Sequence, residues 1–117
     1  MRIASLVLPN QDNQGRDLRT VHAALRGELI TQFGGYTGCP MTGGWRADDG
    51  TDYAESGTLY LVAMEPTQAN RNALADIASE YAGRARQMCV MVAHAEGDVE
   101  FVEPVRAPWA ALTDAAD

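Results

Sequence analysis

The chain has 117 residues with 9 basic and 16 acidic side chains, which gives a formal net charge of −7. A chain of this length forms one domain that buries roughly two-thirds of its unfolded surface, and no apolar run approaches the ~20 residues of a membrane span. The acidic balance disfavours a protein that holds long nucleic acid through its phosphates. All nine basic residues are arginine, so chemistry that needs a lysine is excluded. The first ten residues lack the apolar run of a signal peptide, and we expect a cytoplasmic protein.

The first third of the chain predicts a strand, a polar loop and a helix. Residues 3–8 (IASLVL) form a short apolar run closed by Pro-Asn, as in a buried strand. Residues 10–15 (NQDNQG) are polar and rich in turn formers, so they form either a solvated turn or part of a site. Asp17 is the expected N-cap of a helix over 17–33, in which apolar residues recur every three or four positions. Gly34 and Gly35 end this helix, because glycine adopts the left-handed conformation at little cost.

The middle of the chain predicts a β-hairpin. Residues 36–45 contain threonines, glycines and Pro40, a composition typical of a bulged strand or a strand at the edge of a sheet. Residues 47–50 (ADDG) form the hairpin turn. Residues 53–64 can bury both faces, which predicts a central strand.

The last part of the chain predicts a second helix and two more strands. Pro66-Thr67 opens the helix, and residues 88–95 form a strand. Residues 99–102 can pair back after a turn, and residues 104–117 are expected to run as an extended tail anchored by Trp109. The helix buries a stripe made of Leu74, Ile77, Ala78, Tyr81 and Ala85.

This order of elements predicts an α+β fold of the ferredoxin-like βαββαβ type over residues 1–103. Right-handed crossovers give an antiparallel sheet in the order 4-1-3-2 with both helices on one face, extended by the C-terminal hairpin and tail. Cys39 and Cys89 then lie at opposite edges of the sheet, too far apart for a disulfide, so we expect two free thiols. The uncovered face predicts a homodimer or a higher homo-oligomer.

The predicted topology brings three segments to one end of the sheet: the loop 10–15, the hairpin 43–55 and the start of the last strand at 84–87. We expect this end to bind a ligand. The candidate ligand-binding residues are Asn10, Asp12, Asn13, Trp45, Arg46, Glu55, Arg84, Arg86 and Gln87.

Trp45 and Arg46 follow a glycine pair, and this combination favours a planar anionic ligand. Glycine lets a ligand approach the backbone, tryptophan offers a flat face, and arginine offers a bidentate fork. The alternative is that Trp45 caps the core under the hairpin. Glu55 either accepts hydrogen bonds from a ligand or forms a surface ion pair. His22 borders the apolar stripe of the first helix, where a boundary residue is more common than a catalyst.

The runs VLPNQDNQG and FGGYTGCPMTGGWRADDGTDYAE, followed by YLVAM, resemble a group of small uncharacterised proteins of bacteriophages and bacteria of ferredoxin-like type. The resemblance covers about residues 5 to 64. It implies a phage or prophage origin and therefore puts counter-defence among the possible roles. It implies no catalytic residue, and strand 2 departs from the group at Cys39-Pro40-Met41.

The sequence therefore favours a non-enzymatic protein that holds a small anionic, nucleotide-like ligand near Trp45 and Arg46. We predict no catalytic residue, cofactor or metal ion, and no membrane partner. Two alternatives are open: an inhibitor that binds a host protein, and a small enzyme that uses Glu55 or His22 as a general base.

Overall fold

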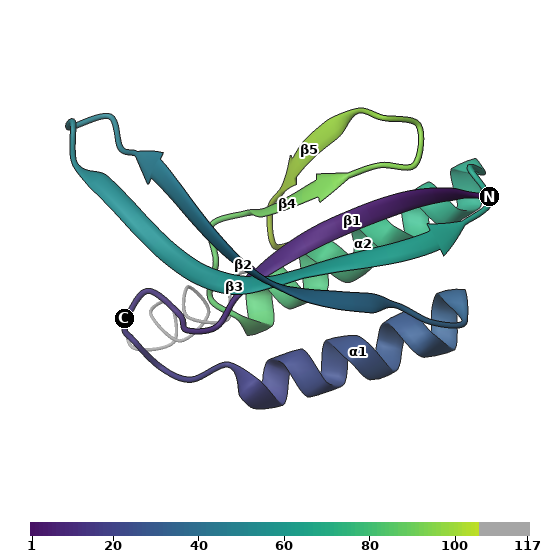
Figure 1. Ribbon diagram of the computed structural model, residues 1–117, viewed down its shortest axis with the longest axis horizontal. Helices are drawn as coiled ribbons and strands as arrows, with labels where there is room; N and C mark the ends of the chain where they lie inside the picture. The colour runs from purple at the N-terminus through teal and green to yellow at the C-terminus, as the bar shows by residue number, and fades with distance from the viewer. Residues whose placement is uncertain (106–117) are drawn as a thin grey trace.

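The computed structural model describes residues 1–105 of the 117-residue chain. Its element order matches the predicted one, including the strand over residues 99–102 (Figure 1). The predicted tail lies almost entirely outside the described residues, and so does its anchor Trp109. No helix within residues 1–105 has the length and apolar character needed to cross a membrane. The elements are β1 (Arg2–Pro9), α1 (Arg19–Phe33), β2 (Thr37–Arg46), β3 (Asp52–Met64), α2 (Gln68–Arg84), β4 (Val90–Ala93) and β5 (Val99–Val102).

The five strands form one antiparallel sheet in the order β2-β3-β1-β4-β5. The predicted four-stranded order 4-1-3-2 is therefore not the order of this sheet. β4 pairs with β1 as expected, but it is not an edge strand, because the turn after residue 95 brings β5 back onto its free side.

Both helices pack on one face of the sheet (Figure 1). Alternate residues of the central strands point to that face, including Leu6 on β1 and Tyr60 on β3, and they are almost fully buried. The opposite face carries Ile3, Met91 and Phe101, which are exposed among the described residues. The core is therefore a single layer between the sheet and the two helices.

Helix α1 begins later than predicted. Its N-cap is Leu18, and the carboxylate of Asp17 accepts a hydrogen bond from the Arg19 backbone N–H at 2.8 Å. Gly34 ends α1 as predicted, with φ of 89° and its N–H donating to the Ile30 carbonyl. Helix α2 has Thr67 as its N-cap, and every residue of its predicted stripe is buried.

Strand β2 is an edge strand, as one of the two interpretations of residues 36–45 predicted. Its register with β3 is unbroken from Thr37 to Arg46, so β2 has no bulge. Pro40 lies opposite Thr58. Proline has no backbone N–H to donate, and an edge strand tolerates it because no further strand pairs with its free side. Cys39 and Cys89 are free thiols, as predicted.

The β2–β3 hairpin projects beyond the rest of the sheet, at the upper left of Figure 1. The pairing of β1 with β3 ends at Pro9 and Gly57, while β2 and β3 continue from Thr42–Ser56 to Arg46–Asp52. These five pairs extend the hairpin by roughly 17 Å. Gly57 is needed at the branch point, because a Cβ there would lie 2.5 Å from the Leu8 carbonyl oxygen.

Candidate functional site

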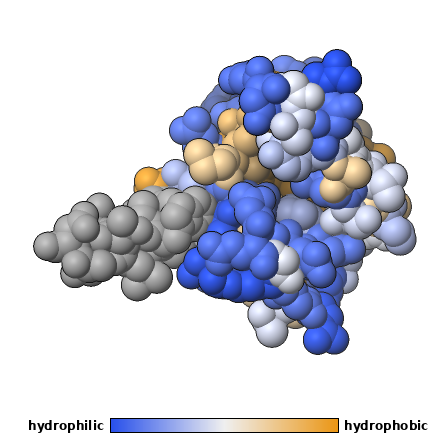
Figure 2. Space-filling view, turned by 90° about the vertical axis from the view of Figure 1, so that its left-hand side faces the viewer, coloured by the Kyte–Doolittle hydropathy of each residue, from blue (hydrophilic) through white to orange (hydrophobic). Residues whose placement is uncertain are grey.

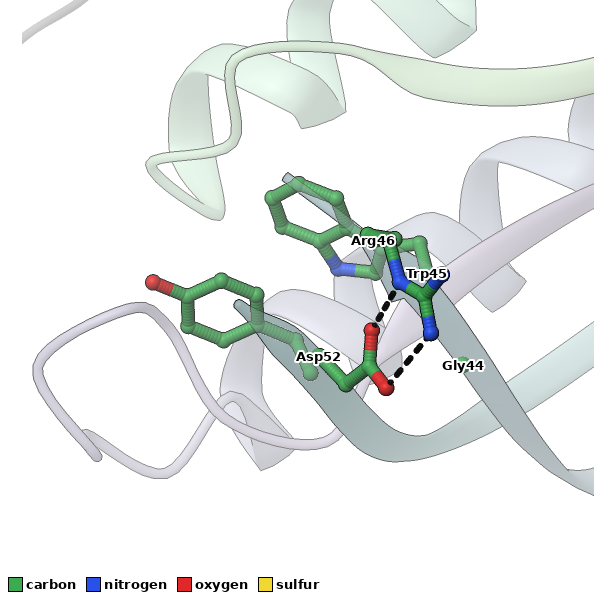
Figure 3. Close-up of a pocket in the computed structure, with 5 residues that line it drawn as sticks. Gly44, Trp45, Arg46 and Asp52 are labelled. Carbon is green, nitrogen blue, oxygen red and sulfur yellow. Dashed lines mark hydrogen bonds and ion pairs between the residues drawn. The ribbon is translucent and has the colours of Figure 1, made fainter. Parts of the chain in front are cut away.

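The tip of the hairpin presents a stacked pair of aromatic rings. Trp45 and Tyr53 are cross-strand partners, and their ring centroids lie 4.8 Å apart at an interplanar angle of 18°. Trp45 is 56% exposed and Tyr53 47% exposed, so Trp45 does not cap the core. Residues Gly44, Trp45, Arg46, Asp52 and Tyr53 line an open pocket at this tip (Figure 3).

The guanidinium of Arg46 is engaged within the hairpin. Its Nε lies 2.6 Å from Oδ1 of Asp52 and its Nη2 lies 3.1 Å from Oδ2, as the dashed lines in Figure 3 show. This bidentate pair raises the pKa of Arg46 and lowers the pKa of Asp52, because each charge is stabilised by the other. The Arg46 guanidinium, which we expected to bind an anionic ligand, is therefore paired with the carboxylate of Asp52.

Glu55 lies on the same face of the hairpin as the two rings. It is two residues from Tyr53 on β3 and opposite Gly43, so no side chain stands across from it. Glu55 is exposed and forms no hydrogen bond or ion pair with another side chain in the part of the chain that the structure describes. One face of the hairpin thus combines two aromatic rings with a carboxylate that has no cation beside it.

The loop after β1 reaches the base of the hairpin, where the Asn10 backbone N–H donates to the Ser56 carbonyl at 2.9 Å. Asp12 is buried, and its carboxylate accepts the backbone N–H groups of Gln14 and Arg16. The hydrogen bond from the Arg16 N–H and the charges of Arg16 and Arg86 lower the pKa of Asp12. Asp12 therefore holds the loop in shape, whereas Asn13 is exposed beside it.

The segment before β4 meets the same loop through Arg86, whose charge acts on Asp12. Arg84 instead pairs with Glu80 at 2.9 Å and lies over the ring of Tyr81 at 4.9 Å. The Gln87 side chain donates to the Ala85 carbonyl at 3.0 Å. Arg84 and Gln87 are thus engaged by their own segment.

Figure 2 shows this end of the molecule face on, with a largely hydrophilic surface and a few hydrophobic residues among it. The structure brings Asn10, Asp12 and Arg86 together at the base of the hairpin. The other predicted group, Trp45, Arg46 and Glu55, lies further out along the projecting hairpin.

A second polar cluster, formed by His22 and Tyr60, lies under the sheet, and the sequence did not predict that these two residues meet. His22 is buried: its Nδ1 lies 2.5 Å from the Tyr60 hydroxyl oxygen and its Nε2 lies 2.8 Å from the Pro9 carbonyl oxygen. A carbonyl only accepts, so Nε2–H donates to Pro9 and the Tyr60 hydroxyl donates to Nδ1 of the neutral ring. The prediction that His22 is a boundary residue is wrong. It lies four residues after Leu18 and three before Leu25, which is the spacing of the buried stripe itself.

The match to known families covers most of the chain. Residues 10–101 match the family described as "Protein of unknown function (DUF3574)", and the chain belongs to this family. The resemblance to uncharacterised small proteins is thereby confirmed at the level of the family. No curated protein matches the sequence.

Two solved structures share the fold. One is described as "Phage SAM lyase in apo state", with a TM-score of 0.67 and 12% sequence identity over 89% of this chain and 90% of that chain. The other is described as "Phage SAM lyase in complex with S-methyl-5′-thioadenosine", with a TM-score of 0.66 and 11% identity over 86% of this chain and 88% of that chain. At these identities the likeness shows a common fold.

The preference for a non-enzymatic protein needs correction. It rested on the predicted convergence of polar loops, arginines and Trp45 at one end of the sheet. The two solved structures that share the fold over nearly the whole length of both chains are described as a SAM lyase, which is an enzyme. The expectation that this chain is not an enzyme is therefore withdrawn.

Proposed function

We propose that this chain is a small enzyme that binds S-adenosylmethionine (SAM), or a closely related adenosine sulfonium, and breaks a carbon–sulfur bond. The observation that carries the proposal is the face formed by Trp45, Tyr53 and Glu55 on a fold shared with a SAM lyase. The proposal keeps the nucleoside-like ligand that the sequence favoured but replaces the anion with a cation, because Arg46 is paired with Asp52.

The chemistry of this face suits both halves of such a ligand. A base that stacks on an exposed aromatic ring gains about 1–3 kcal/mol. A sulfonium is a cation with little hydration, and an aromatic face contributes about 0.5–2 kcal/mol to holding a cation. Glu55 supplies the opposite charge on the same face. The net charge of −7 adds attraction at long range.

The bond cleavage converts the sulfonium into a neutral thioether. When the bond between sulfur and the aminobutyrate carbon breaks, its electron pair stays on sulfur and S-methyl-5′-thioadenosine leaves. A lyase adds no water, so the carbon fragment either bonds to its own carboxylate oxygen or loses a proton from the neighbouring carbon. In the second case Glu55 accepts this proton as the general base, which is the role given to it in one of the alternatives drawn from the sequence.

Consumption of SAM would deprive the methyltransferases of a cell of their methyl donor. This supports a counter-defence role if the gene proves to be carried by a phage, as the shared fold with a phage enzyme suggests.

The test is chromatographic detection of S-methyl-5′-thioadenosine after incubation of the purified chain with SAM. We expect Trp45→Ala and Glu55→Gln each to lower kcat/KM by about tenfold or more, which corresponds to about 1.4 kcal/mol. Arg84→Ala is the control, since Arg84 pairs with Glu80 outside the hairpin, and its turnover should match the wild type. Equal turnover in the wild type and the three variants would show that the site does not lie on this face.

A further inference from the structure

The arginines of this acidic chain are mostly paired with carboxylates. Arg16, Arg19, Arg46, Arg71 and Arg84 each lie within 4.0 Å of an aspartate or glutamate oxygen. Arg26 on α1 is half-buried and has no such partner among residues 1–105. A guanidinium that is partly removed from water without a counter-charge is unfavourable, so an external anion at this position would be stabilised.

The surroundings of Arg26 can position such an anion. Arg26 lies one helical turn after His22, whose ring contacts the Tyr60 hydroxyl, and the charge of Arg26 counteracts the rise in the pKa of Tyr60 that burial causes. Thr58 precedes Tyr60 by two residues on the same face of β3 and is half-buried. The half-buried ring of Tyr36 packs edge-on against Tyr60, with centroids 5.7 Å apart. Thr58, Tyr36 and Tyr60 thus lie together beside Gly38, and Arg26 lies on α1, which packs against β3 (Figure 1).

The backbone leaves this place open on the β2 side. Gly38 is exposed, and a Cβ added there would be in ordinary contact with Thr58, Tyr36 and Tyr60 at 3.6–3.7 Å. Because Gly38 has no side chain, nothing from that position covers the group.

We propose that Arg26, Thr58 and Tyr36 form a binding site for a small carboxylate monoanion, separate from the hairpin face. The two carboxylate oxygens would accept from the guanidinium fork and from the two hydroxyl groups. A single guanidinium balances one negative charge, so the site favours a monoanion over a dianion such as HPO₄²⁻.

The Tyr60–His22 pair reports the occupancy of this site. An anion that pairs with Arg26 neutralises a charge that acts on the Tyr60 hydroxyl. The hydrogen bond from Tyr60 to His22 then changes in strength, and the ring nitrogens of His22 respond without contacting the anion. The site is on the helix side of the sheet, so the inference does not depend on the proposed function.

The experiment is a titration of the ¹⁵N-labelled full chain with sodium acetate, and separately with sodium phosphate, at constant ionic strength and at a constant alkaline pH at which phosphate is the dianion. We expect saturable shifts of the His22 ring nitrogens with acetate and a weaker response to phosphate. Arg26→Gln should weaken acetate binding by about tenfold. Arg86→Gln removes another half-buried arginine and should leave binding unchanged.

A second variant separates binding from structure. Tyr60→Phe removes the reporting hydroxyl, so the His22 response should disappear while the backbone amide of Thr58 still shifts with acetate. The proposal is overturned if the acetate shifts are the same in Arg26→Gln and the wild type, with both folded by circular dichroism. A response to phosphate equal to that of acetate would overturn the assignment of a monoanion.

Discussion

The hydrogen bond between Tyr60 and His22 gives the sharpest test of the structure itself. Tyr60→Phe removes one hydroxyl and leaves the ring and its packing in place. Nδ1 of His22 then loses its donor, while Nε2 remains committed to the Pro9 carbonyl. His22 is 5% exposed, so water has little access to the vacated acceptor.

A buried acceptor left without a donor costs about 1–3 kcal/mol. We therefore expect Tyr60→Phe to lower the free energy of unfolding by that amount and to lower Tm by several degrees. The assay is urea unfolding followed by far-UV circular dichroism, with equal m-values as the sign that only stability has changed.

Tyr53→Phe is the matched control, because it makes the same chemical change in a half-exposed ring whose hydroxyl has no side-chain partner among the described residues. Its effect should lie within about 0.5 kcal/mol. If Tyr60→Phe were as mild as Tyr53→Phe, the buried relay from Tyr60 through His22 to the β1 backbone would be wrong.

Two further predictions concern stability. Gly57→Ala should lower the free energy of unfolding by more than about 3 kcal/mol or prevent folding, because the new Cβ would lie 2.5 Å from the backbone of β1. Gly27→Ala on the open side of α1 should instead raise the free energy of unfolding by about 0.5–1 kcal/mol. Thermal unfolding of both variants checks this. The hydrogen bond from Arg71 lowers the pKa of Asp98 from 3.8 to about 2, so the stability that this pair contributes is present above pH 3.8 and is lost as the pH falls toward 2. Asp98→Asn should flatten the acid limb of a plot of Tm against pH, and Asp48→Asn should not.

The elements of the fold were accessible from the sequence because their signals are local. The glycine after α1, the turn before β3 and the threonine that caps α2 each act within a few residues. The order of the sheet was only partly accessible. The sequence predicted that residues 99–102 pair back after a turn, but the predicted order ended at the fourth strand, so β4 was placed at an edge that β5 in fact covers.

The candidate site was also predictable from the sequence only in part. The sequence singled out Trp45 but not Tyr53, which the register of the hairpin places opposite Trp45. The engagement of Arg46 by Asp52 depends on side-chain conformations at the tip, and the sequence assigned that guanidinium to a ligand. His22 and Tyr60 are 38 residues apart, and only the packing of α1 on β3 brings them together.

The central claim is that this chain cleaves an adenosine sulfonium. Its most direct test is an NMR time course of SAM labelled with ¹³C in the sulfonium methyl group, mixed with the purified full-length chain. The account predicts that the sulfonium methyl signal is replaced by the thioether methyl signal of S-methyl-5′-thioadenosine, faster than in a sample without protein. A methyl signal that neither broadens nor decays faster than in that blank would show that the chain neither binds nor cleaves SAM, and would contradict the account.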